Sequence, residues 1–219
     1  SEPEKIERAL SNMIKSWTDK LKAQIDQNTG NHILNQYIPL IPNHYKERTN
    51  VEQALLDLNA LHNLDKTNPS FSLIPFTYPL DSDLANKASI LRVYSRKKID
   101  LINIVPILKN LGFHVIDQLT ARIGDKTKTH GFFQLFRLTD SNHLPIDHQL
   151  SQIIEETLSH IFKGTASDDP LNELILKTGL SWKKIQIIKA YRNYYLQVQQ
   201  THTKDKLNET MIKNPNSCQ

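Results

Sequence analysis

The hydrophobic residues of the first quarter of the chain recur at three- and four-residue steps, the spacing that places them on one face of a helix. A long amphipathic helix is predicted over about residues 4–27, and a shorter helical stretch over 32–37. A third helix is expected to begin after Thr49 or Asn50, because either side chain can cap a helix. Its predicted apolar face comprises Val51, Ala54, Leu55, Leu58 and either Leu61 or His62.

The middle third has the patterns of strands. Strands are predicted over 71–79, 88–96, 113–122 and 131–138, because these runs are rich in β-branched and aromatic residues. Pro75 marks the first run as an edge strand or an interrupted one, since proline cannot donate to a sheet.

One further helix is predicted between the second and third strands. Its apolar stripe comprises Leu101, Ile104, Val105, Leu108 and Leu111. The helix is expected to end at Gly112. If Asn103 is its N-cap, Pro106 falls at the third helical position, where the missing N–H would have had no partner in the helix.

The last third is predicted to be helical over 147–163, 170–177, 181–200 and 204–213. From residue 50 to 140 the order of elements is helix, strand, strand, helix, strand, strand. This order predicts an α+β fold of the ferredoxin-like type with permuted connections, in which two helices cover one face of a four-stranded antiparallel sheet.

The amino-acid composition is typical of a soluble protein. Hydrophobic residues make up 38% of the chain and charged residues 23%, which is ordinary for a globular protein. We expect no membrane contact, because no stretch approaches the roughly 20 apolar residues of a membrane span. The N-terminus lacks the apolar core of a secretory signal, and the one cysteine, Cys218, cannot staple the fold. The expected localisation is therefore cytoplasmic.

The net charge of +4 arises in the middle third of the chain, where a basic cluster comprises Arg92, Arg96, Lys97 and Lys98. Such a cluster is typical of a phosphate-facing patch or of a solvated strand edge.

The run "HGFFQLFRL" (130–138) places Phe132 and Phe136 on one face of a strand and Phe133 on the other, as in an RNA recognition motif. Aromatic residues on a strand are more often core. The alternative function is a small nucleic-acid-binding module.

Enzymatic chemistry is not indicated. The six glycines are too far apart for the dinucleotide or phosphate loops that need closely spaced glycines, so no cofactor is expected to bind this chain. His143, Asp147 and His148 form the best candidate metal cluster, but no H-E-x-x-H or C-x-x-C spacing supports it. We therefore predict no catalytic, cofactor-binding or metal-binding residue.

Residues 176–197, "LKTGLSWKKIQIIKAYRNYYLQ", have the layout of a helix-turn-helix, with a stop at Gly179 and a start at Ser181. A recognition helix needs a polar surface facing the DNA groove. Here a second apolar stripe comprises Ile187, Tyr191, Tyr194 and Val198. We therefore predict a packing helix, with Trp182, Ile187 and Tyr194 buried or at a subunit contact. Lys183, Lys184 and Lys189 are expected in solvent.

Four blocks of the sequence resemble the N-terminal, non-catalytic half of the large bacterial NAD-specific glutamate dehydrogenases. They are "SWTDKL" with the following "YIPLIPNHYKERTNVEQALLDLNAL", "LRVYSRKKIDLINIVPILKNLGFHVID", "IFKGTASDDPLNELIL" and "GLSWKKIQIIKAYRNYYLQ". The matching positions, which we expect to be structural, are Trp17, Asp19, Tyr45, Pro106, Gly112, Gly164, Asp169, Asn172, Gly179, Trp182, Tyr191 and Tyr194. Within the same blocks, Ala54 and Asp57 fit the family's Ala-x-x-Asp helix. This chain departs from the family pattern at Asn103, Gln118, Ser167, Lys189 and Tyr195; the family has glutamate at 167 and arginine at 189.

The resemblance implies an organisation and a function. Residues 1–48 would be an N-terminal helical segment, 49–142 an ACT-like α+β domain, and 143–219 a C-terminal helical subdomain that is cut short. The whole family enzyme oxidatively deaminates L-glutamate to 2-oxoglutarate with NAD. This segment would be a non-catalytic regulatory and oligomerisation part of it. Its partners would be the catalytic domain of the same chain, other subunits of a homo-oligomer and an amino-acid effector, but no nucleic acid.

Overall fold

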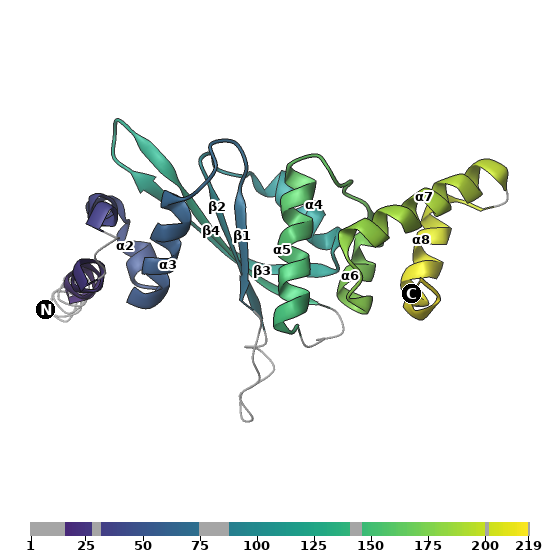
Figure 1. The fold of residues 1–219 in the computed structure, drawn as a ribbon, viewed down its shortest axis with the longest axis horizontal. Coiled ribbons are helices and arrows are strands. Elements are labelled where there is room, and N and C mark those ends of the chain that lie inside the picture. The colour runs from purple at the N-terminus through teal and green to yellow at the C-terminus, as the bar shows by residue number, and fades with distance from the viewer. Residues whose placement is uncertain (1–15, 28–31, 75–87, 141–145, 200–201, 219) are drawn as a thin grey trace, which may run out of the picture. The chain divides into compact units, whose positions relative to one another are not determined.

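The computed structural model describes residues 16–27, 32–74, 88–140, 146–199 and 202–218 (Figure 1). The predicted helix at residues 4–15, Pro75 with the end of the first predicted strand, and His143 lie outside these ranges. No helix in the described ranges is long and apolar enough to cross a membrane.

Four strands form one antiparallel sheet in the order β1-β2-β4-β3. They are β1 (Ser70–Ile74), β2 (Ser89–Ser95), β3 (Phe113–Gly124) and β4 (Thr129–Asp140). Helix α3 (Val51–His62) precedes β1, and α4 (Leu101–Asn110) lies between β2 and β3 in the chain. The predicted α+β class and the predicted order of elements are therefore confirmed.

The chain divides into two compact units, each of which includes part of the sheet. The first comprises residues 1–70, 93–98 and 119–134, and the second comprises 71–92, 99–118 and 135–219. All contacts described below lie within one unit or the other.

The first unit contains the N-terminal helix (residues 16–27), η1 (His32–Leu40), α2 (Asn43–Lys46) and α3. Its core includes Leu21, Ile25, Leu34, Tyr45, Ala54, Leu58, Leu61 and Phe133. Asn50 caps α3, since its side chain accepts from the Gln53 N–H at 2.8 Å. The stretch predicted as a short helix is a 3₁₀ helix that contains Pro39, a residue without the N–H that an α-helical ladder requires.

In the second unit, α5 (His148–Phe162) lies against β1. Asp147 caps the helix by accepting from the Leu150 N–H at 2.7 Å. The Phe71 and Phe162 rings are 5.3 Å apart, and Glu155 accepts from the Leu73 N–H at 2.6 Å. Burial raises the pKa of Glu155. Because β1 is an edge strand, this carboxylate occupies a backbone donor that would otherwise be open to another strand.

From residue 170 onward the described part of the second unit is helical, as predicted. It contains η3 (Pro170–Asn172), α6 (Glu173–Thr178), α7 (Trp182–Val198), α8 (Lys204–Lys213) and η4 (Pro215–Cys218). The short η4 is the one element of this stretch that the pattern did not indicate.

The predicted start of α4 is wrong. Its N-cap is Asp100 rather than Asn103, so Pro106 lies at the sixth helical position and interrupts the hydrogen-bond ladder instead of preceding it. The carbonyl that loses its partner is that of Ile102, a residue that is 80% exposed. Water can therefore satisfy this carbonyl, which explains how the helix tolerates an interior proline.

Candidate functional site

Helix α7 follows α6 after a short turn. The C-cap of α6 is Gly179, whose φ of 69° lies in the left-handed region that glycine adopts without strain. Ser181, in extended conformation, is the N-cap residue of α7. The predicted stop and start are therefore confirmed, and what this helix can do depends on its two faces.

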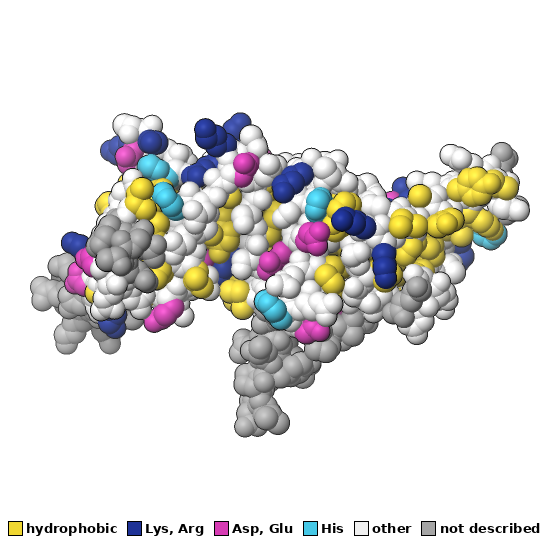
Figure 2. Space-filling model, viewed as in Figure 1, with side chains coloured by type: hydrophobic (Ala, Val, Ile, Leu, Met, Phe, Trp, Pro, Cys, Tyr) yellow, Lys and Arg dark blue, Asp and Glu magenta, His cyan; other side chains and the backbone are white. Residues whose placement is uncertain are grey.

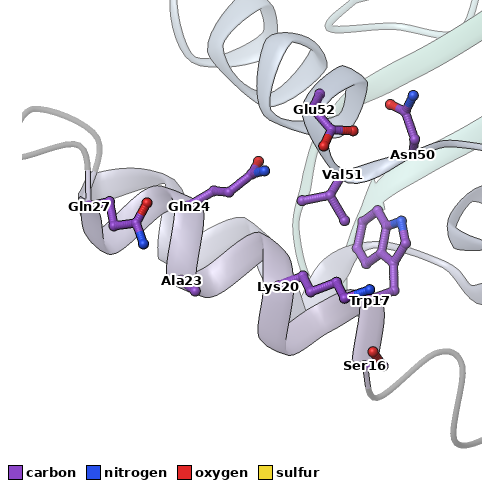
Figure 3. Close-up of a pocket in the computed structure, with 9 residues that line it drawn as sticks. All are labelled: Ser16, Trp17, Lys20, Ala23, Gln24, Gln27, Asn50, Val51 and Glu52. Atoms are coloured by element: carbon purple, nitrogen blue, oxygen red, sulfur yellow. The ribbon is translucent and has the colours of Figure 1, made fainter.

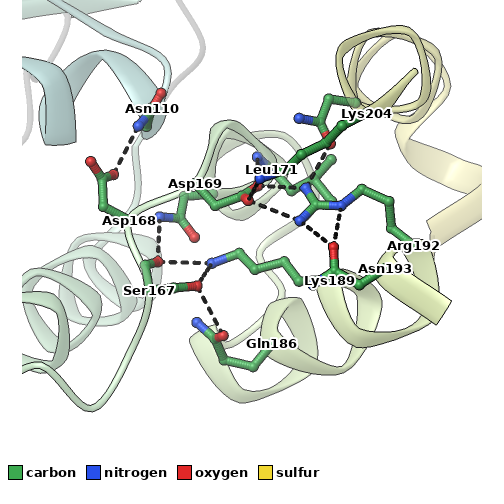
Figure 4. A network of polar contacts seen from close by, with 12 residues as sticks. Asn110, Ser167, Asp168, Asp169, Leu171, Gln186, Lys189, Arg192, Asn193 and Lys204 are labelled. Atoms are coloured by element: carbon green, nitrogen blue, oxygen red, sulfur yellow. Dashed lines mark hydrogen bonds and ion pairs between the residues drawn. The ribbon is translucent and has the colours of Figure 1, made fainter. Parts of the chain in front are cut away.

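The inner face of α7 is held by a buried ion pair (Figure 4). Arg192 and Asp169 are 4% and 5% exposed. The guanidinium donates from Nη1 to Oδ1 at 2.8 Å and from Nη2 to Oδ2 at 2.9 Å. Nη1 also donates to Oδ1 of Asn208 at 2.7 Å, and Asp169 accepts from the Leu171 N–H at 3.0 Å. This bidentate geometry joins η3, α7 and α8.

The ion pair keeps Asp169 ionised. Burial by itself raises the pKa of the carboxyl group, but hydrogen bonds from Arg192 and Leu171 and the charges of Arg192 and Lys189 outweigh it. The resulting pKa is about 2. A fixed negative charge therefore sits among the helices at neutral pH.

Lys189 belongs to the same buried face, so the prediction that it is solvated is wrong. It is 4% exposed, and Nζ donates to the backbone oxygen of Ser167 at 2.9 Å and to its Oγ at 3.2 Å. Burial lowers the pKa of Lys189 to about 8, although the charge of Asp169 acts in the opposite direction. Lys189 is four residues after Ile185 and three before Arg192, which places all three on one side of the helix.

Two of the departures from the family pattern thus contact each other. Ser167 and Lys189 stand where glutamate and arginine are expected, and the structure places the lysine on the serine. Lys189 therefore donates to neutral oxygens at the place where the resemblance would put a carboxylate. Sequence reasoning identified both positions but not their contact, because they are 22 residues apart.

The outer face of α7 is apolar and exposed. Ile187, Tyr191, Tyr194 and Val198 have exposed fractions of 56%, 72%, 66% and 61%, and Figure 2 shows hydrophobic side chains gathered along this helix. Ile187 and Tyr194 were predicted to be buried or at a subunit contact. Burial is wrong, because Lys189 and Arg192 occupy the buried side of the helix, and a subunit contact stays a prediction. Lys183 and Lys184 are exposed, as predicted.

Trp182 joins the start of α7 to α5. It is half-buried, and its ring stacks on the His160 imidazole with centroids 4.0 Å apart. Its Nε1 donates to Oε1 of Glu156 at 3.0 Å. The predicted packing role of Trp182 therefore agrees with its contacts.

A second polar cluster lies buried in the first unit. Asp57 is fully buried and accepts from the hydroxyl groups of Tyr45 and, at 2.8 Å, Tyr94. Gln53 Nε2 donates to the same carboxylate at 2.8 Å. The two tyrosine rings lie 5.4 and 5.8 Å from the Phe133 ring. The resemblance identified Tyr45 and Asp57, whereas Tyr94 was missed because its role depends on β2 lying beside α3.

A groove of about 860 Å³ runs between the N-terminal helix and the start of α3 (Figure 3). Trp17 closes one end, where its Nε1 donates to the Thr49 oxygen at 2.7 Å. Lys20 and Glu52 are the charged residues of the lining, opposite in sign. Such a mixed, open lining does not define a reaction, and Trp17 acts as an anchor between two helices.

The other positions that match the family occupy helix ends or the surface. Gly112 has a φ of 90°, and Gly164 has a φ of 72°. Asn172 is 2% exposed and donates to the Ser167 oxygen at 3.3 Å. Asp19 and Pro106 are exposed. These residues shape turns and contacts and do not converge on one chemical centre.

Three of the residues that suggested nucleic-acid binding are used inside the protein. Arg92 is 6% exposed. Arg96 donates to the backbone oxygens of His130 and Leu64 at 2.8 and 2.9 Å. Phe136 is fully buried. Of the basic cluster, Lys97 and Lys98 are the exposed members.

The described members of the candidate metal cluster have other roles. Asp147 caps α5, and the His148 ring lies 3.2 Å from Gln152 Nε2. Among the residues with described positions, no group of three or more His, Cys, Asp or Glu has an arrangement that could hold a metal ion.

Comparison with known proteins gives two family matches. Residues 76–151 match the model for the ACT3 domain of glutamate dehydrogenase, and residues 166–219 match the model for its helical motif 3. The first match extends into α5, and the second begins just before the Asp169 ion pair and contains α7.

Curated relatives agree with these matches. The NAD-specific glutamate dehydrogenase of Pseudomonas aeruginosa is 25% identical over 90% of this chain, and that of Halomonas elongata is 22% identical over 96%. The enzyme of Mycobacterium tuberculosis is 20% identical over 94% of the chain. The chain spans only 12% to 13% of the length of these relatives. With two models of one family covering more than half of its residues, the chain belongs to the NAD-specific glutamate dehydrogenase family, in which it corresponds to the ACT3 domain and helical motif 3.

Proposed function

We propose that this chain is a non-catalytic regulatory and assembly segment of a cytoplasmic NAD-specific glutamate dehydrogenase. The whole enzyme would oxidatively deaminate L-glutamate to 2-oxoglutarate with NAD. The catalytic work would belong to another part of the longer protein, because the chain corresponds to about one eighth of its relatives and to two of their named modules.

The observation that carries the assembly role is the asymmetry of α7. One side is fixed by the Arg192–Asp169 ion pair, and the opposite side exposes four large apolar side chains. A stripe of exposed aromatic and aliphatic residues on a rigidly held helix is typical of a protein–protein contact. The partner would be another subunit or the catalytic domain.

Two measurements test this proposal. The purified chain is mixed with L-glutamate and NAD and followed by the absorbance of NADH; we expect no turnover, and turnover would overturn the non-catalytic assignment. In the longer enzyme, Tyr191→Asp together with Tyr194→Asp is expected to reduce the oligomer mass measured by light scattering. The matched control is Ile102→Asp on α4, which removes an apolar side chain that is 80% exposed outside this stripe. An oligomer that tolerates the tyrosine changes would contradict the assembly role.

The regulatory part of the proposal is an amino-acid effector of the ACT-like unit. A ligand that binds only the folded state raises its melting temperature. We therefore expect one of the twenty amino acids to raise the melting temperature of the chain. An unchanged melting temperature with all twenty would contradict the effector proposal.

A further inference from the structure

The outer stripe of α7 has the same spacing, and the same kinds of residue, in both directions along the helix. Ile187, Tyr191, Tyr194 and Val198 are separated by four, three and four residues, so that a β-branched residue lies at each end and a tyrosine at each inner position. Steps of four and three are the spacing of a coiled-coil seam, which packs against another helix. A stripe with this symmetry is complementary to itself when two copies run antiparallel.

Pairing about a two-fold axis requires that the same patch serve both copies. In an antiparallel pair centred on the stripe, Ile187 would lie level with Val198 of the second copy, and Tyr191 level with Tyr194 of the second copy. The tyrosine rings, 72% and 66% exposed, would then meet at the centre of the contact. Aromatic side chains at the centre are typical of interfaces.

The charges of α7 favour the same direction. Its sequence contains Lys183 and Lys184 in the first turn and no acidic residue. A parallel pair would bring the lysines of both copies together. An antiparallel pair instead places each pair of lysines beside the C-terminal end of the other helix, where the helix dipole is negative.

We propose that the partner of this face is a second copy of the chain, bound through antiparallel pairing of the two α7 helices. This inference rests on the proposed assembly role and names its partner. Four side chains form a small interface, so the dissociation constant of the isolated chain is expected in the micromolar range, about 1–100 µM.

Cysteine cross-linking tests the direction and register of the pair. Two proteins are prepared in a Cys218→Ser background, one with Ile187→Cys and one with Val198→Cys. Residues 187 and 198 are about 16 Å apart along the helix axis, whereas a disulfide requires Cα atoms within about 7 Å. We therefore expect a disulfide-linked dimer when the two proteins are mixed and mildly oxidised, and little or none from either protein by itself.

The outcomes separate the possibilities. If each protein alone formed disulfide-linked dimers as fast as the mixture does, the antiparallel register would be wrong. A monomer by sedimentation at concentrations up to several hundred micromolar would overturn self-pairing and favour another part of the longer protein as the occupant, leaving the assembly role intact. Catalytic turnover by the chain, measured separately, would instead contradict the proposed function.

A charge variant gives an independent check. Tyr191→Asp is expected to weaken self-association at least tenfold, because it puts a carboxylate at the centre of the contact. Ile102→Asp is the control and should leave the dissociation constant unchanged. Both positions are exposed, so circular dichroism should show the same helix content in the two variants; equal dissociation constants would contradict the proposal.

Discussion

At the scale of residues, the helical end of the protein depends on a few buried charges. Asp169 and Arg192 form a bidentate pair, whereas Lys189 donates to the neutral oxygens of Ser167. Burying a charge is costly unless it is paired and hydrogen-bonded. We therefore expect the removal of each side chain to change the free energy of unfolding by a different amount.

The Arg192–Asp169 pair should contribute strongly to stability. Arg192→Ala leaves a buried carboxylate without its bidentate partner, and we expect a loss of about 3–5 kcal/mol in the free energy of unfolding. Lys204 also approaches Asp169, at 3.4 Å, but its side chain is 54% exposed. Lys204→Ala should therefore cost less than about 1 kcal/mol. Urea unfolding followed by circular dichroism measures both, and similar losses would contradict the assigned role of the pair.

The same ion pair predicts that the stability of the protein falls at acidic pH. The pKa of Asp169 is about 2 in the folded protein, below the ordinary value of 3.8. The stability that the ionised Asp169 contributes is present above pH 4 and is lost as the pH falls through 2. Asp65 and Asp125 also have lowered pKa values, so the informative quantity is a difference. Melting temperatures of wild type and Arg192→Ala should converge as the pH falls from 4 to 2; a constant gap would contradict this assignment.

Ser167→Glu should stabilise the protein. Residue 167 is exposed, so a carboxylate there keeps contact with water while it approaches the Lys189 ammonium. We expect a gain of about 0.5–1.5 kcal/mol and a rise in the pKa of Lys189 above its value of about 8. Denaturant titration measures the gain. Ser167→Gln, of similar size and without charge, is the control and should give no comparable increase.

At the scale of elements, glycines decide where helices end and which helices can approach each other. Gly112 and Gly164 both follow a helix with positive φ values, 90° and 72°. Their surroundings differ. A Cβ at residue 112 would lie 3.0 Å from Glu173 Cγ and 3.3 Å from Leu176 Cδ2, whereas nothing lies within 4 Å of a Cβ at residue 164.

This difference gives a matched pair of substitutions. Gly164→Ala should cost about 1 kcal/mol, the strain of placing an L-residue in the left-handed region. Gly112→Ala adds the clash with α6, and we expect about 2–3 kcal/mol in total. Thermal unfolding of both variants measures the difference. Equal losses would show that the contact between Gly112 and α6 does not constrain stability.

At the scale of the whole molecule, the basic cluster in the region that gives the net charge of +4 is only partly exposed. Two members of the basic cluster, Arg92 and Arg96, are buried or bonded to the protein's own backbone. The exposed apolar residues of α7 are instead concentrated on one helix face. We therefore expect association with protein rather than with phosphate.

Salt distinguishes these two kinds of association. Binding to nucleic acid weakens steeply as salt rises, because phosphate contacts release counterions. Contact through apolar side chains should keep its strength between 0.1 and 1 M NaCl. Sedimentation at both salt concentrations should give dissociation constants for self-association that differ far less than those of a nucleic-acid complex. Fluorescence titration with RNA or DNA at low salt should show no binding, and a salt-sensitive complex would restore the alternative function.

The sequence by itself determined most of the elements, because hydrophobic periodicity and caps act over a few residues. α8 begins and ends where predicted, and α5 differs by one residue at each end. The strands and the α+β class followed from the change of period in the middle third. Local signals were insufficient at α4, where Asn103 was the predicted cap and the structure has Asp100.

Only the tertiary structure decided which polar residues meet and which apolar face stays exposed. Lys189 and Ser167, and Tyr94 and Asp57, are far apart in the chain, so no local pattern could pair them. Both sides of α7 looked apolar in sequence, since a buried arginine and lysine cannot be told from solvated ones without their partners. The ion pair with Asp169 assigned the inner side, and the four residues opposite it became the candidate interface.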